Sequence, residues 1–110
     1  MSKVAPREQV CKYLCSQFSL PVEQVDALLP GFIATLASHM VNVENALVAG
    51  ELKALGKTAH TMKGALLNLG MTDGAELAQQ IETHGKAGDH TVNYAVLVAE
   101  LRQSLAGLIH

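Results

Sequence analysis

Residues 51–70 read ELKALGKTAHTMKGALLNLG, and this segment has the clearest helical pattern in the chain. Apolar residues recur in it at intervals of three and four, which is typical of the buried face of an amphipathic helix. They are Leu52, Leu55, Ala59, Met62, Leu66 and Leu69. Gly70 follows, and glycine often takes the left-handed conformation just after a helix. We therefore predict a helix from about Glu51 to Leu69 that packs on a core through this stripe.

The same spacing predicts further helices on both sides of this segment. They run from about Pro6 to Phe18, from about Pro21 to Val48, and from Thr72 or Asp73 to about His84, where Gly85 and Gly88 close the helix; Asp89 caps the last one. Pro30 should kink or break the second, because its ring clashes with the preceding turn.

Short connections between these helices favour antiparallel neighbours. We expect one all-α domain over residues 1–110. It would consist of a short additional N-terminal helix in about residues 1–19 and an up-and-down antiparallel four-helix bundle in about residues 20–110.

The composition limits the class of protein. The chain has 110 residues and a net charge of −2, so it lacks the strongly basic face of most nucleic-acid-binding proteins. Its beginning lacks the apolar stretch of a signal peptide, and the longest nearly apolar run, Ala27 to Ala37, is too short to cross a membrane. Cys11 and Cys15 are best explained as reduced thiols. We expect a cytoplasmic protein that binds neither nucleic acid nor membrane.

One face of the central helix is unusual for a helix built only for stability. It carries three lysines and no acidic residue, and two glycines stand inside the helix, each at a cost of about 1 kcal/mol relative to alanine. The residues on this face are Lys53, Gly56, Lys57, His60, Lys63, Gly64 and Leu67. A neutral imidazole is a nucleophile toward phosphoryl groups, and Lys63 lies one turn from His60, where an ammonium group offsets incoming negative charge. A solvated histidine without a function remains the alternative at this point.

The string Ala59-His60-Thr61-Met62-Lys63-Gly64, continued to Leu69-Gly70, carries more information than the face alone. It closely resembles the signature of the histidine-containing phosphotransfer (HPt) family, Ala-His-x-Leu-Lys-Gly, followed by a small or apolar stretch and Leu-Gly. Met62 replaces the more common leucine, a swap that keeps the volume. The downstream match is looser, with Leu77, Ile81 and Glu82 on the next helix.

The resemblance implies a role for each matching residue. His60 resembles the phosphoacceptor, Lys63 the residue that neutralises the phosphate, and Gly64 the small residue over which a receiver domain docks. Glu82 lies where the family often has a partner for the inner ring nitrogen of the histidine. An exposed carboxylate paired with Lys86 is an equal alternative.

Other residues of this face give weaker signals. Leu67, Gly56, Lys57 and Lys53 are candidates for the receiver-docking face, although the lysines fit a solvated surface equally well.

The resemblance also implies the partners. They are response-regulator receiver domains and a sensor histidine kinase, which can be a hybrid kinase. The chain has no glycine-rich phosphate loop, so we expect a monomeric phosphoryl carrier and not an enzyme, without a cofactor, because the Mg²⁺ of the reaction belongs to the receiver. The methionine start favours a free-standing protein over a domain of a larger kinase.

Two other functions remain as alternatives. One is a helical adaptor that is never phosphorylated. The other is a metal-binding bundle, which needs Glu-x-x-His pairs, whereas Glu82 and His84 have the wrong spacing. We therefore predict no metal site.

Overall fold

The computed structural model describes residues 6–109 of the chain. Within these residues it contains five helices: α1 (Pro6–Phe18), α2 (Val22–Ala49), α3 (Leu52–Asn68), α4 (Thr72–Lys86) and α5 (Tyr94–Ser104). The same residues contain no β-strand, only an isolated bridge between Ala106 and Ile109. The prediction of an all-α fold is therefore confirmed.

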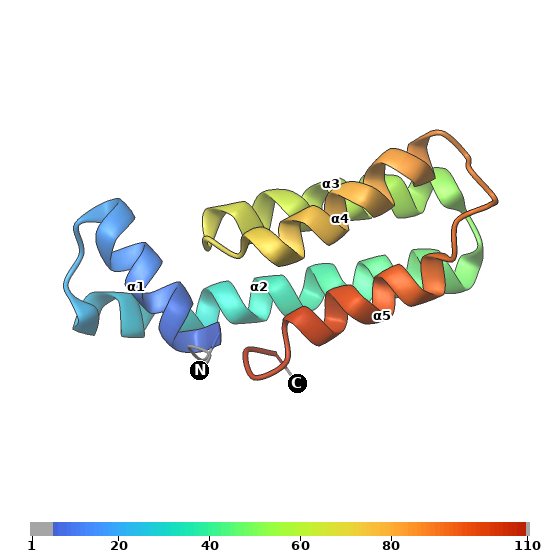
Figure 1. Cartoon of the computed structure of the whole chain (residues 1–110). Helices are drawn as coiled ribbons and strands as arrows, with labels where there is room; N and C mark the ends of the chain where they lie inside the picture. The colour runs from blue at the N-terminus through green and yellow to red at the C-terminus, as the bar shows by residue number, and fades with distance from the viewer. Residues whose placement is uncertain (1–5, 110) are drawn as a thin grey trace.

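Four of the helices, α2 to α5, enclose the core. α3 packs against both α4 and α2, and α5 packs against the same two helices. In Figure 1, α3 and α4 lie above α2 and α5, and α1 crosses the beginning of α2. Each helix contributes buried side chains, among them Val10, Leu14, Leu29, Leu36, Met40, Leu55, Met62, Leu66, Ile81 and Leu101. Burial of each such side chain stabilises the fold by about 1.5–3 kcal/mol. The apolar stripe of α3 therefore faces the core, and the opposite face of the helix faces solvent.

Pro30 does not interrupt α2. The helix runs from Val22 to Ala49 with Pro30 inside it, so the predicted break does not occur. Leu29 before the proline and Leu36 after it are both fully buried, while Pro30 itself is exposed. Packing on both sides thus outweighs the roughly 3 kcal/mol that a proline costs inside a helix.

The last helix begins later than the sequence predicted. α5 starts at Tyr94, and the side chain of Asn93 caps it by accepting a hydrogen bond from the backbone N–H of Val96 (3.2 Å). Asp89 instead accepts from the backbone N–H and the hydroxyl of Thr91, at 2.8 and 2.6 Å. An aspartate bonded to the chain two residues on makes a local turn, which is why it does not act as the cap.

The backbones of α3 and α4 come close together at two glycines. A Cβ atom on Gly85 would lie 2.8 Å from the carbonyl oxygen of Leu52 and 3.1 Å from the backbone nitrogen of Gly56. No side chain fits there, so these glycines set the distance between the two helices. Gly85 therefore lies inside α4 and does not end it; Gly88, with a φ of +67°, follows the helix as expected.

Candidate functional site

His60 lies in the middle of α3 with its side chain 60% exposed. Its Nδ1 atom is 2.7 Å from Oε2 of Glu82 on α4. A carboxylate only accepts hydrogen bonds, so Nδ1 must carry the proton and donate it. The other ring nitrogen, Nε2, has no hydrogen-bond partner among residues 6–109, so in the neutral ring it carries the lone pair.

Glu82 is the only charged residue buried in the described part of the chain, with a side chain that is 9% exposed. Three groups donate to it: Nζ of Lys63 to Oε1 at 2.7 Å, Nζ of Lys86 to Oε2 at 2.8 Å, and the imidazole of His60. The bonds from Lys63, from Lys86 and then from His60 lower the pKa of Glu82 from its usual 4.5 to about 2, against the opposing effect of burial. The carboxylate is therefore ionised at neutral pH.

Glu82 makes one contact from each of the two interpretations that the sequence left open. Glu82 contacts the imidazole of His60, and it also pairs with Lys86 four residues on. Glu82 is nevertheless buried and not exposed as the pairing with Lys86 alone would imply, because α4 packs closely on α3 at this point.

Lys63 is held in place from two sides. Its side chain is 21% exposed, and Nζ donates to Oε1 of Glu82 and, at 2.8 Å, to Oε1 of Gln79. Gln79 in turn donates to the hydroxyl of Thr83 at 2.8 Å. The sequence analysis missed Gln79 and Thr83. Their positions one turn apart on α4 were visible, but nothing in the pattern showed that they face Lys63.

The remaining residues of the predicted docking face separate into two groups. Gly64, Leu67, Lys53 and Lys57 are exposed, and a Cβ atom added to Gly64 would meet nothing within 4 Å. Gly56 was wrongly placed on this exposed face. It is buried, and a Cβ atom there would lie 2.9 Å from Cγ of Lys86, so the body that approaches Gly56 is α4 itself.

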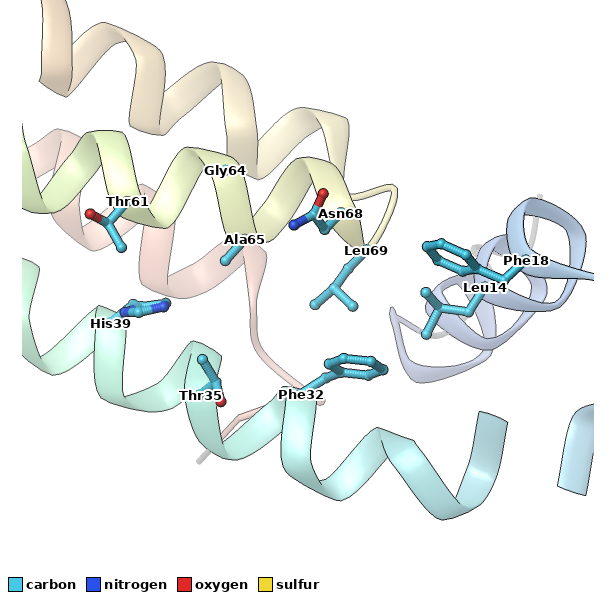
Figure 2. Close-up of a pocket in the computed structure, with 10 residues that line it drawn as sticks. All are labelled: Leu14, Phe18, Phe32, Thr35, His39, Thr61, Gly64, Ala65, Asn68 and Leu69. Atoms are coloured by element: carbon cyan, nitrogen blue, oxygen red, sulfur yellow. The ribbon is translucent and has the colours of Figure 1, made fainter. Parts of the chain in front are cut away.

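A groove of about 640 Å³ opens on the side of α3 away from α4, between α1, α2 and α3. Figure 2 shows its lining, with Leu14 and Phe18 from α1, Phe32, Thr35 and His39 from α2, and Gly64 among the residues from α3. Phe18 and Phe32 are 57% and 40% exposed. The sequence analysis did not predict this groove. Exposed phenylalanines cannot be told from buried ones by spacing alone, since both lie on apolar helical faces.

Two other classes of site receive no support. No group of three or more His, Cys, Asp or Glu residues capable of holding a metal ion occurs within residues 6–109. In the same part of the chain, no helix has the length and apolarity needed to cross a membrane.

Comparison with known proteins agrees with this geometry. A family model described as the Hpt domain matches residues 27–110, well over half of the chain, and leaves α1 outside the match. Searches of curated proteins and of solved structures find no match. Members of the Hpt family carry phosphoryl groups in two-component phosphorelays, where they interact with receiver domains and kinases, and they are not enzymes in general. On the strength of the family match, this chain belongs to the Hpt domain family.

Proposed function

We propose that this chain accepts a phosphoryl group on His60 and relays it between receiver domains of response regulators. The observation that carries the proposal is an exposed imidazole whose Nδ1 donates to a buried, ionised carboxylate at 2.7 Å. This bond selects one tautomer and fixes the ring, and it leaves the lone pair of Nε2 available to an incoming group.

The transfer step needs no external base, because no proton has to be removed from the imidazole. The Nε2 lone pair attacks the phosphorus of a receiver's aspartyl phosphate, the N–P bond forms, and the P–O bond to the aspartate breaks with its electron pair on that carboxylate. Nδ1 keeps its proton throughout. The phosphorylated ring is then cationic, and the negative charge of Glu82 stabilises it. The reverse step returns the phosphoryl group to a second receiver.

Lys63 supplies positive charge for the arriving phosphoryl group. At rest it binds Glu82 and Gln79, so it must turn away from Glu82 to meet the phosphoryl oxygens. It lies three residues after His60 on the same helix, within reach of a group on Nε2. An ammonium group in this position stabilises charge that develops during the transfer.

The partner's footprint includes Gly64 and Leu67. Both are exposed beside His60, and Gly64 also lines the apolar groove of Figure 2. Lys57 and Lys53 lie about one and two turns before His60 on α3 and attract an acidic receiver at long range. A response-regulator receiver domain and a sensor histidine kinase are the partners we propose.

The proposed carrier has a definite oligomeric state, domain organisation and cellular location. We infer a monomeric carrier whose residues 1–110 make one module, with α2 to α5 as the up-and-down antiparallel bundle, supported by the packing of α3 and α5 on both α2 and α4. It has no resident cofactor, because Mg²⁺ acts in the receiver. It works in the cytoplasm, where thiols such as the free Cys11 and Cys15 stay reduced.

The experiment is transfer from receiver domains phosphorylated with a small acyl phosphate. We expect a base-stable, acid-labile label on this chain and none on His60→Gln. His84→Gln is a matched control, because Nδ1 of His84 also faces a carboxylate, that of Asp89, at 3.4 Å; it should be labelled normally. Label that persists in His60→Gln would contradict the site. Receiver binding without any label would favour the adaptor function instead.

A second variant tests Lys63 by itself. Lys63→Ala should slow transfer by roughly ten-fold or more, because one charged donor to the transferred group is lost, while circular dichroism stays helical. An unchanged rate would remove Lys63 from the mechanism.

A further inference from the structure

The two lysines that bind Glu82 use different oxygens. Nζ of Lys63 binds Oε1 at 2.7 Å, whereas Nζ of Lys86 binds Oε2 at 2.8 Å. Oε2 is also the oxygen that accepts the proton of His60 Nδ1, at 2.7 Å. Lys63 can therefore leave the carboxylate without disturbing the oxygen that holds the imidazole.

Lys86 is fitted into this site more closely than an ordinary surface lysine. A Cβ atom on Gly56 would lie 2.9 Å from its Cγ atom and 3.0 Å from its backbone nitrogen, so the stem of Lys86 runs along α3 where Gly56 has no side chain. Lys12 offers the contrast. It also pairs with a glutamate four residues away, Glu8, but at 3.4 Å and with both side chains more than half exposed.

Glu82 needs a second cation when the phosphoryl group arrives. The negative charge of that group repels the carboxylate and at the same time draws Lys63 away. A buried carboxylate that loses its cations is strongly disfavoured in its ionised form. The charged and titratable groups in contact with Glu82 are His60 and Lys63 from α3 and Lys86 from α4. Once Lys63 has turned away, Lys86 is the only lysine left on the carboxylate, beside the ring that becomes cationic on phosphorylation.

We propose that Lys86 is a positioning residue that holds the Glu82 carboxylate on Nδ1 of His60 while Lys63 turns to the phosphoryl group. This inference rests on the proposed transfer through His60. In it, the conspicuous glycine at position 56 provides the space that lets the Lys86 side chain lie against α3.

The first test needs no phosphate. In Lys63→Met, the lysine that would turn away is absent, and nitrogen NMR of the His60 ring reports which nitrogen carries the proton. We expect the Nδ1–H form to persist in Lys63→Met and in Lys86→Met, and to be lost in the double variant. Lys86→Arg in the Lys63→Met background should restore it, because the guanidinium keeps the charge. A double variant that retains the wild-type tautomer would overturn the inference.

The second test is the pH profile of transfer, which a purely structural role of Lys86 would not move. Without the Lys86 ammonium, protons bind the site more readily, so the acidic limb of the Lys86→Met profile should move up by about 0.5–1 pH unit. On that limb transfer slows about three- to ten-fold. The profile of Lys86→Arg should coincide with that of the wild type. Lys12→Met, which removes the lysine of the exposed Lys12–Glu8 pair, is the control and should also keep the wild-type profile.

The outcomes separate the two proposals. A Lys86→Met profile that coincides with the wild-type profile would overturn the role of Lys86, even with normal transfer through His60. If no receiver phosphorylates the wild-type chain, the proposed function fails, and the tautomer measurement still decides whether Lys86 holds Glu82 on His60. Lys86 is half exposed, so we expect the single variant to keep its fold.

Discussion

A glycine lies on each of two sides of α3, and the surroundings of the two glycines differ. We call the side toward α4 the closed side and the side toward α1 and α2 the open side. Toward α4, Gly56 lies against Gly85 and Lys86 with no room for a methyl group, and the buried Glu82 is bound by three donors. Toward α1 and α2, Gly64 borders an open apolar groove, and a methyl group there would contact nothing. The side toward α4 holds the imidazole through Glu82, whereas the side toward α1 and α2 leaves the surface at Gly64, one turn after His60, uncovered. A phosphoryl carrier needs both, because the acceptor must be rigid and the partner must reach it.

The largest effect should come from filling the closed side. Gly85→Ala puts a methyl group 2.8 Å from the carbonyl oxygen of Leu52, and the backbone has to move because no flexible side chain can give way. We expect a loss of about 2–3 kcal/mol in the free energy of unfolding, as for overpacked cores, measured by urea denaturation. Gly31→Ala on α2 is the control, since its methyl group meets nothing within 4 Å; it should be stabilising, by up to about 1 kcal/mol. Equal midpoints for the two variants would contradict the close approach.

A smaller effect concerns the charge of Glu82. Its pKa is lowered from 4.5 to about 2 in the folded chain, so the ionised form contributes stability above pH 4.5, and this contribution is lost as the pH falls toward 2. We expect Glu82→Gln to be roughly 1–2 kcal/mol less stable at pH 7, after allowing for the water around His60 and Lys86.

The difference between wild type and Glu82→Gln should disappear as the pH falls from about 5 to 2, when urea denaturation is repeated at each pH. Other carboxylates titrate in both proteins and cancel in the comparison. A difference that stays constant over this range would show that the pairing of Glu82 does not depend on its charge.

The sequence predicted the inner and outer faces of α3 well but not what lies against them. Leu55, Ala59, Met62 and Leu66 are buried and His60 is exposed, because a stripe of period 3.6 fixes which way a helix faces. Gly56 was misplaced because it lies at the edge of that stripe. Whether an edge residue meets solvent or a neighbouring helix depends on where α4 packs, which α3 alone does not encode.

The spacing within one helix was enough to predict part of the site. His60, Lys63 and Gly64 follow from α3, and the Glu82–Lys86 pair follows from its four-residue separation on α4, whereas the contact of Glu82 with Lys63 depends on the packing of α4 on α3. Gly85 gave a misleading signal, since a glycine near the end of a helix usually marks its end. Here it matches Gly56 across the interface.

On the open side, Gly64→Ala should separate stability from transfer. Alanine is about 1 kcal/mol more favourable than glycine inside a helix, and the added methyl group is free of contacts, so the melting temperature should rise. Phosphotransfer from a receiver should nevertheless slow, because the methyl group occupies space on the proposed docking face. A rise in melting temperature with an unchanged transfer rate would place the docking face elsewhere.

On the same side of α3, Phe32 lines the groove and is 40% exposed. Phe32→Ser removes an aromatic side chain of the kind that often dominates binding interfaces, so we expect the dissociation constant of the receiver to rise about three- to ten-fold. The transfer rate at saturating receiver should not change, because Phe32 does not contact the His60–Glu82–Lys63 cluster. Val48→Ser is the matched control, at the other end of α2 and 87% exposed. If both variants bind the receiver with equal affinity, the groove has no part in docking, and the open side of α3 serves the partner through Gly64 and Leu67 alone.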